Sequence, residues 1–188
     1  TPRPWPEAPA CPAVDAAFAR AGVPSLDPWL RRGGARALVV VRAGAIACEW
    51  YRRPADRDRG AMAFSVSKTL TSLLAARAVA AGAIDSLDEP ITARIPELAR
   101  RDARMSAVRL ADLLDMRSGL GFSEDAHFPW VDQDAPAVYY ASDLARTVVR
   151  RPRLVEPRGT FRYNDYAPNL VGLALERATG TRAAAATQ

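Results

Sequence analysis

The sequence predicts a domain of the α+β class, in which one β-hairpin precedes a mainly helical part. Two apolar runs that include β-branched residues, Ala37–Val41 and Ala45–Tyr51, are separated by a short turn that contains Gly44, and this pattern is typical of a hairpin. Apolar residues then recur at helical spacing over Ser67–Ala81 and over Leu170–Ala178, and a glycine follows shortly after each segment. Such a glycine commonly ends a helix, so we expect helices to dominate the rest of the chain.

The beginning of the chain has a different composition. Residues 1–12 contain five prolines, which favours an extended lead-in, and a short helix from about Ala13 to Ala21 is expected to end at Gly22. We therefore expect residues 1–35 to be a proline-rich lead-in with one short helix, and residues 36–188 to belong to a single domain.

The helix predicted over Ser67–Ala81 has an apolar face, which we expect to be buried against its neighbours. The residues on this face are Leu70, Leu73, Leu74, Ala78 and Ala81. The later elements are expected to be a short helix at Leu110–Met116, a tight loop at Ser118–Gly121, mostly helix over Pro136–Arg150, an extended Thr160–Tyr163 and a last helix with Pro168 in its first turn.

The net charge of +5 raises nucleic acid or an anionic membrane surface as a partner. The arginines, however, occur in short pairs among acidic residues, such as Arg31-Arg32 and Arg150-Arg151. We therefore expect solvated surface charge and no nucleic-acid partner. His127 is the only histidine, so we expect it to lie in a loop, and we expect neither a metal nor a cofactor.

Two features of the sequence bear on the cellular location of the protein. No run approaches the roughly 18 apolar residues of a membrane span, and the chain begins at Thr1 without a signal segment. We expect a signal or membrane anchor upstream of this sequence and a location outside the cytoplasm, periplasmic or secreted, with a cytoplasmic location as the alternative. Cys11 and Cys48 are expected to be free thiols; in an exported protein they would instead pair and pin the N-terminal segment to a strand.

Lys68 is the only lysine in a chain whose other basic side chains are all arginine, and Ser65 precedes it by one helical turn. A serine hydroxyl is a poor nucleophile that needs a neighbouring base, and lysine can lose its proton whereas guanidinium cannot. Unpaired N–H groups at the start of the helix would also stabilise an oxyanion. Chance alone places a serine at this spacing about one time in twenty, and Ser65 would then be a helix cap beside a surface lysine.

Three segments in the same order resemble the serine β-lactamase-like hydrolases. They are Phe64–Leu74, Leu110–Leu120 and Arg162–Gly180. Over about residues 36–181 the chain is similar to the branch of class C β-lactamases, DD-peptidases and esterases that includes the 6-aminohexanoate-oligomer hydrolases. The resemblance implies a β-lactamase/transpeptidase-like fold and a small-molecule amide or ester substrate.

The resemblance also implies a role for individual residues. Ser65 would be the acylated nucleophile and a backbone oxyanion donor, Lys68 its activating partner, and Tyr163, as the tyrosine of a YxN motif, the proton relay. A phenol beside an ammonium group is favoured as the phenolate, which can act as a general base. Without the resemblance, Tyr163 would be interpreted as a core aromatic residue.

Two departures from the family pattern are visible. Asp165 stands where the YxN motif has asparagine, so a substrate-binding amide is replaced by a group that only accepts hydrogen bonds when ionised and that would keep Lys68 protonated. In addition, the 25 residues after Tyr163 contain no lysine or histidine for the family's Lys/His-Thr/Ser-Gly strand. We therefore expect residues 36–188 to be the N-terminal part of a single β-lactamase-like domain, with the C-terminal strands of its sheet missing.

Two functional hypotheses follow. The first is a serine hydrolase that forms an acyl-enzyme on amide or ester substrates. The alternative is an inactive or incomplete β-lactamase-like fragment that acts as a binding module, which the Asp165 replacement and the missing strand favour.

Overall fold

The computed structural model describes residues 11–124 and 133–182, and it divides the chain into two compact units, Thr1–Met62 and Ala63–Gln188. The hairpin therefore groups with the N-terminal helices, whereas the sequence places a boundary after residue 35. That boundary and the assignment of residues 36–188 to one domain stay predictions. His127 and residues 1–10 of the lead-in lie outside the described residues.

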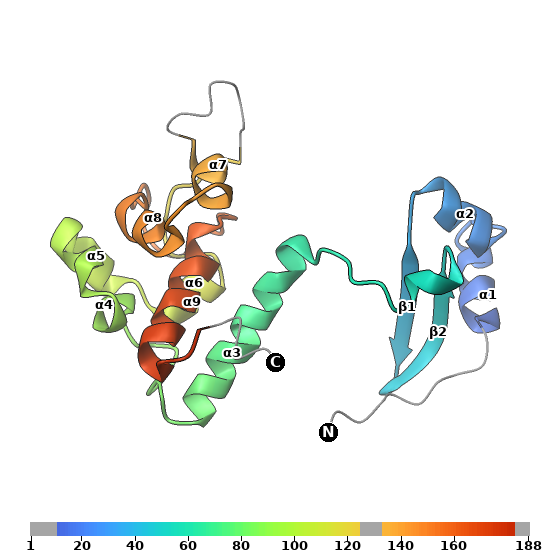
Figure 1. The fold of residues 1–188 in the computed structure, drawn as a ribbon, viewed down its shortest axis with the longest axis horizontal. Coiled ribbons are helices and arrows are strands. Elements are labelled where there is room, and N and C mark those ends of the chain that lie inside the picture. Colours follow the sequence, from blue (N-terminus) through green and yellow to red (C-terminus); the bar gives the residue numbers. More distant parts are fainter. Residues whose placement is uncertain (1–10, 125–132, 183–188) are drawn as a thin grey trace. The chain divides into compact units, whose positions relative to one another are not determined.

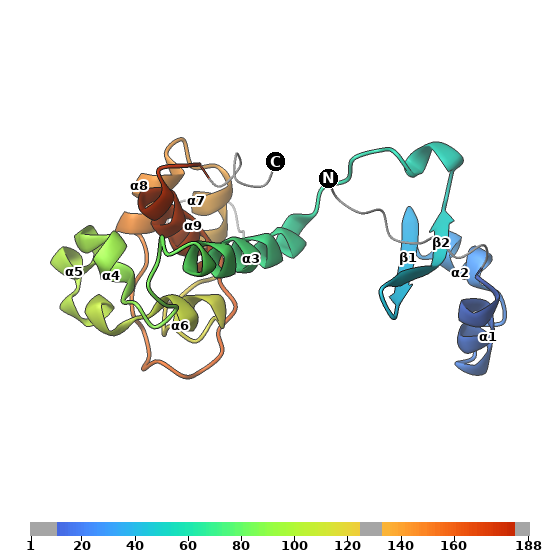
Figure 2. The same ribbon diagram turned by 90° about the horizontal axis from the view of Figure 1, so that it is seen from below.

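The first unit consists of two helices and a hairpin. Helices α1 (Pro12–Arg20) and α2 (Leu26–Arg32) precede the antiparallel strands β1 (Ala37–Arg42) and β2 (Ala45–Tyr51), and a short 3₁₀ turn, Pro54–Asp56, follows. Both views show the two helices on the same side of the hairpin (Figure 1 and Figure 2). The predicted hairpin is confirmed. Its two-residue turn places Ala43 and Gly44 at positive φ, as a turn that follows the twist of the strands requires.

Helix α2 was not expected from the sequence. Ser25 is extended and precedes the first turn, where Pro28 is tolerated because the N–H groups of that turn have no partner inside the helix. Asp27 accepts a hydrogen bond from Trp50 Nε1 at 2.8 Å and forms an ion pair with Arg31 at 2.8 Å. The hydrogen bond from Trp50 joins α2 to β2, while the ion pair lies within α2, and proline content alone gave no indication of either contact.

The expectation of free thiols is wrong. Cys11 and Cys48 form a disulfide, with their Cα atoms 4.6 Å apart. Cys11 directly precedes α1, and Cys48 is fully buried on β2. The bond therefore ties the N-terminal segment to the hairpin, as the alternative interpretation described. A unit of this size buries little apolar surface, so a covalent link between distant segments compensates for a small core.

The second unit is helical and is built around α9 (Tyr166–Thr179), which packs against α3, α4, α6 and α8 (Figure 1). The surrounding elements are the 3₁₀ turn Phe64–Val66, α3 (Ser67–Ala80), α4 (Ile91–Arg94), α5 (Pro96–Arg101), the 3₁₀ turn Ala103–Ala107, α6 (Leu110–Leu114), α7 (Asp134–Tyr139) and α8 (Leu144–Arg150). Apolar residues of α9 at helical spacing, among them Leu170, Val171 and Ala174, are fully buried in the core. Gly180 at φ 68° ends the helix, as predicted.

Helix α3 matches the predicted bounds to within one residue, but the prediction for its apolar face is only partly right, because Ala78 is buried and Leu74 packs against the core while the other leucines are exposed. Leu70 is 48% exposed and Leu73 61% exposed, while the buried residues of this helix are Ala75 and Ala78. The small alanine side chains allow α3 to approach α9 closely. Periodicity identifies which face of a helix is apolar, but a face is buried only where a partner element covers it.

The remaining predictions differ from the structure in detail. The segment predicted as mostly helical over Pro136–Arg150 is divided into α7 and α8, with a break at residues 140–143. Thr160–Tyr163 is irregular and pairs with no strand in the described part of the chain. No described helix is both long and apolar enough to cross a membrane.

Candidate active site

The structure brings all four predicted site residues together. Ser65 Oγ accepts a hydrogen bond from Lys68 Nζ at 3.1 Å and another from the Tyr163 hydroxyl at 2.7 Å. Lys68 Nζ also lies 2.7 Å from Asp165 Oδ1 and 5.0 Å from the centre of the Tyr163 ring. Residues almost one hundred positions apart in the sequence therefore meet at a single hydroxyl.

Ser65 is presented by a strained turn. It lies in the 3₁₀ turn that leads directly into α3, which places Lys68 in the first turn of that helix. Phe64, the residue before Ser65, has a φ of 44°, which is a rare conformation for a bulky residue and costs about 1–3 kcal/mol. Ser67 Oγ donates a 2.6 Å hydrogen bond to the Phe64 carbonyl and helps to hold this conformation. The turn leaves Ser65 exposed to solvent.

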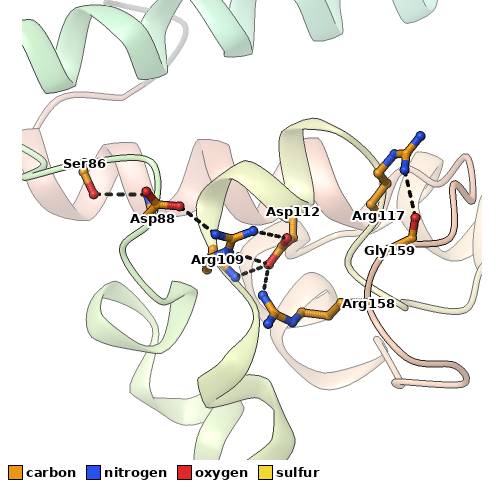
Figure 3. Close-up of polar contacts among 7 residues, drawn as sticks. All are labelled: Ser86, Asp88, Arg109, Asp112, Arg117, Arg158 and Gly159. Carbon is orange, nitrogen blue, oxygen red and sulfur yellow. Dashed lines mark hydrogen bonds and ion pairs between the residues drawn. The ribbon is translucent and has the colours of Figure 1, made fainter.

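Tyr163 reaches Ser65 because the irregular segment before it is tied to α6 and to the turn after α6. The Asp112 carboxylate of α6 accepts hydrogen bonds from Arg109 and, at 2.7 Å, from Arg158 (Figure 3). Arg117 Nη1 donates to the Gly159 carbonyl at 3.0 Å, and backbone bonds join Gly159 to Arg117 and Arg162 to Met116. These contacts fix the segment without strand pairing.

The short α6 thus has a structural purpose that its sequence did not show. Asp112 is buried although it is charged. Burial raises the pKa of its carboxyl, but hydrogen bonds from Arg109 and Arg158 together outweigh this effect, so the pKa is lowered. A buried carboxylate is stable only when it is paired in this way. Asp112 therefore stays ionised and holds Arg158, four residues from the start of the Arg162-Tyr163-Asn164-Asp165 motif.

The electrostatics of the site favour a charged lysine. Burial lowers the pKa of Lys68, but hydrogen bonds to Asp165 and Tyr163 outweigh that effect, so the pKa of Lys68 is raised. Asp165 is itself buried, and its carboxylate is close enough to Nζ for a direct ion pair. Lys68 is therefore an ammonium group at neutral pH in this arrangement.

Asn164 has a structural position. Its side-chain oxygen accepts a hydrogen bond from the Ala167 backbone N–H at 2.7 Å, and its Nδ2 donates to the Arg162 carbonyl at 3.0 Å. The buried amide thus caps the start of α9. It is occupied by backbone groups and does not replace the asparagine that the YxN motif would have at position 165.

Sequence reasoning missed Tyr139. This residue ends α7, and its side chain is exposed. The negative charge of Asp165 and a hydrogen bond to it raise the pKa of Tyr139, which places the phenol beside the Lys68–Asp165 pair. A tyrosine in a predicted helix, 26 positions before Asp165, carries no local signal of this contact. Among the described residues there is no group of three or more His, Cys, Asp or Glu side chains that could hold a metal ion.

Comparisons with known proteins identify the family of the chain. A model of the beta-lactamase family matches residues 27–188. The 6-aminohexanoate-dimer hydrolase of Paenarthrobacter ureafaciens is 28% identical over 120 residues, which is 64% of this chain and 30% of that protein. A solved structure, the putative 6-aminohexanoate-dimer hydrolase from Bacillus anthracis, matches with a TM-score of 0.68 at 20% identity and covers 85% of this chain and 44% of its own.

The chain thus spans less than half the length of each of these relatives. The structural likeness confirms the predicted fold, that is, a hairpin and a helical region that form part of a β-lactamase-like fold. Because the family model covers most of the sequence, the chain belongs to the beta-lactamase family, whose members are hydrolases.

Proposed function

We propose that this protein is a serine hydrolase that forms an acyl-enzyme at Ser65 on small-molecule amide or ester substrates. The observation that supports this most strongly is the convergence of Lys68 Nζ and the Tyr163 hydroxyl on Ser65 Oγ, at 3.1 Å and 2.7 Å. A nucleophile within hydrogen-bonding distance of a base that is itself oriented by a third group is the arrangement that covalent catalysis requires.

The geometry suggests how the protons move. In the proposed first step Lys68, once it has lost its proton, takes the proton of the Tyr163 hydroxyl, while the Tyr163 oxygen takes the proton from Ser65 Oγ as this oxygen attacks the substrate carbonyl carbon. The Tyr163 hydroxyl then gives the proton to the leaving nitrogen or oxygen. Water then gives a proton to the same Tyr163–Lys68 relay and attacks the carbonyl carbon of the ester at Ser65. The bond from this carbon to Ser65 Oγ breaks, Oγ takes a proton back from Tyr163, and the acid is released. The backbone N–H of Ser65, at the N-terminal end of α3, would stabilise the oxyanion in both steps.

An amide or ester substrate class is supported by the family and by the relatives. The two relatives carry names that specify a 6-aminohexanoate dimer as their substrate. For this chain we propose the broader class only, with Asp165 at the position of a substrate-binding residue. Asp165 offers a substrate a hydrogen-bond acceptor where asparagine would offer a donor, so we expect it to select a substrate group that carries an N–H or O–H.

The disulfide supports a location outside the cytoplasm. Stable disulfides form in oxidising compartments and are rare in the cytosol, and Cys11 and Cys48 are joined here. We therefore propose a periplasmic or secreted protein, delivered by a signal or anchor encoded upstream of Thr1. Cell fractionation tests this proposal: the protein should be found with periplasmic or secreted markers, and recovery with cytosolic markers would contradict it.

The Lys68–Asp165 ion pair favours a second candidate function. At 2.7 Å the carboxylate competes with Ser65 for the lysine, and a site held in this state would bind a carbonyl compound without cleaving it. In this alternative the chain is a binding module derived from a hydrolase. The two candidates differ in one observable, which is turnover.

Hydrolysis of p-nitrophenyl acetate and of a p-nitroanilide by the purified 188-residue chain separates them. The hydrolase proposal expects release of p-nitrophenol that is lost in Ser65→Ala and Lys68→Met. Ser72→Ala is the matched control, because Ser72 lies in α3, seven residues after Ser65, and its hydroxyl donates to the Lys68 backbone carbonyl at 3.5 Å. Binding of both compounds without turnover would favour the binding module. Equal turnover by Ser65→Ala would reject the hydrolase proposal.

A further inference from the structure

A second feature of the helical unit is a cavity of about 810 Å³ whose lining residues do not include Ser65, Lys68 or Tyr163. Four of the residues around it are arginines: Arg150, Arg151, Arg153 and Arg162. Asp134 is the acidic residue of the lining, and Phe122 and Val155 supply apolar surface. A cavity of this size is within the range of small-molecule sites.

The positive charge of this cavity is only partly compensated. Arg162 forms a 2.7 Å ion pair with Glu156. No acidic side chain in the described parts of the chain forms an ion pair with Arg150, Arg151 or Arg153. These guanidinium groups thus share one cavity and repel one another, and an anion between them would lower that repulsion.

The acidic residue of the lining, Asp134, forms no ion pair with these arginines among the described residues. Asp134 accepts a 2.6 Å hydrogen bond from the Tyr166 hydroxyl and a 2.9 Å bond from the Ser123 backbone N–H. Both bonds hold its carboxylate within the wall of the cavity. Among the described residues, Asp134 therefore anchors α7 to α9 and to the segment after α6.

The wall is preformed. The Gly121 N–H donates to the Arg153 carbonyl at 2.9 Å, the Val155 N–H donates to the Gly119 carbonyl at 3.0 Å, and Leu120 and Leu154 form an antiparallel bridge. A Cβ atom on Gly121 would lie 2.7 Å from Val155 Cγ1, so the two segments are in close contact. Arginines on a fixed backbone lose less conformational freedom on binding than arginines on a mobile loop.

We propose that this arginine cavity, defined by Arg150, Arg151, Arg153 and Arg162, is a binding site for a small organic anion that carries a carboxylate or phosphate group. Guanidinium groups bind both oxyanions through paired, charge-assisted hydrogen bonds. The apolar surface of Phe122 and Val155 favours a ligand with a short carbon skeleton over a bare inorganic ion. The site makes no use of Ser65, so it does not depend on the proposed hydrolase activity.

Calorimetric titration of the 188-residue chain with succinate and with glycerol 3-phosphate, at constant ionic strength, tests the proposal. Saturable binding of either compound is expected, and the tighter of the two identifies the preferred group. The double variant Arg151→Gln/Arg153→Gln should weaken binding by about tenfold or more, because charge-assisted bonds are lost. Ser65→Ala should bind as the unmodified chain does.

The control is Arg146→Gln, which removes the same charge from an exposed position of α8 outside the lining. It should change the affinity by less than about twofold, as expected for a screened surface charge. Should the double variant fail to fold, Arg150→Gln, which changes one exposed side chain, should still weaken binding measurably. Absence of saturable binding by both compounds, or an equal loss in Arg146→Gln, would overturn the proposal.

Discussion

Lys68 Nζ lies 2.7 Å from the Asp165 carboxylate, so the only lysine of the chain has an acidic partner at the position where the YxN motif would have a neutral asparagine. The same ammonium group donates to Ser65 Oγ at 3.1 Å. The Lys68 ammonium group therefore links Ser65, the candidate nucleophile, to Asp165, which keeps Lys68 protonated. This relationship decides how the site responds to pH and to substitution.

Asp165→Asn should move the rising, acidic limb of the pH–rate profile to lower pH and increase the rate of acylation at pH 7. Burial lowers the pKa of Lys68, and Asp165 reverses that effect and raises it. Without this carboxylate the effect of burial is no longer offset by Asp165, so the pKa of Lys68 falls and Lys68 loses its proton at lower pH. Stopped-flow acylation across the pH range measures the shift. Asp115→Asn, an exposed site, is the control, and an unchanged or slower rate for Asp165→Asn would show that Asp165 does not control Lys68.

Phe64→Gly should be more stable than Phe64→Ala, by about 1 kcal/mol. Glycine in a helical turn is ordinarily less stable than alanine by about 0.5–1 kcal/mol, so the expected order is reversed. The cause is the φ of 44° at Phe64, which alanine must also adopt and which glycine adopts without strain. Because Phe64 is 71% exposed, little burial is lost in either variant. Urea unfolding measures the free energy of unfolding of both variants. If Phe64→Ala were the more stable of the two, the turn would be unstrained.

Reduction of the disulfide, or Cys48→Ser, should destabilise the first unit by about 4 kcal/mol, the value expected for closing a loop of this length. The two cysteines are 37 residues apart in sequence. Tryptophan fluorescence monitors this unit through Trp29 and Trp50, which contact neighbouring side chains there. Dithiothreitol should leave the stability of a Cys11→Ser/Cys48→Ser variant unchanged. Two free thiols in the unreduced, denatured chain would contradict the expectation.

Leu170→Ala and Leu73→Ala should differ widely in how much they lower the free energy of unfolding. Leu170 is fully buried in the core around α9, and removing a buried leucine side chain costs about 2–5 kcal/mol. Leu73 is 61% exposed, so its replacement should change the free energy of unfolding by less than about 0.5 kcal/mol. Chemical denaturation followed by circular dichroism compares them. A large cost at Leu73 would indicate that the apolar face of α3 is covered in solution.

Local patterns in the sequence were sufficient for the hairpin and for the long helices. The hairpin depends on two apolar runs and a tight turn, and α3 and α9 depend on apolar spacing and a terminal glycine, all of which are encoded within a few residues. The burial of these elements is not encoded locally. Leu70 and Leu73 lie on the predicted apolar face of α3 and remain exposed because nothing among the described residues covers them, whereas Ala75 and Ala78 of the same helix are buried, and α3 as a whole packs against α9.

The sequence selected four candidate residues that the structure brings together, whereas Tyr139 and most of the geometry were not predicted. The spacing of Ser65 and Lys68 within one helical turn and the resemblance of the Tyr163 segment were enough to select all four residues. The tie from Arg158 to Asp112, the positive φ of Phe64 and the approach of Tyr139 to Asp165 were not foreseen. Each depends on a contact or a backbone angle that the packing of distant segments imposes. The pairing of Cys11 with Cys48 likewise depends on the packing of segments that are distant in the sequence.

The most direct test of the account is covalent labelling of the 188-residue chain with a fluorophosphonate, read by intact mass and peptide mapping. Ser65 Oγ should displace fluoride from phosphorus and form one stable adduct per chain, located on the peptide that contains Ser65. Labelling should be lost in Ser65→Ala and strongly slowed in Tyr163→Phe, and it should be retained in Ser72→Ala. An adduct that forms equally in Ser65→Ala, or no adduct in the folded chain, would contradict the claim that Ser65, Lys68 and Tyr163 form an acylation site.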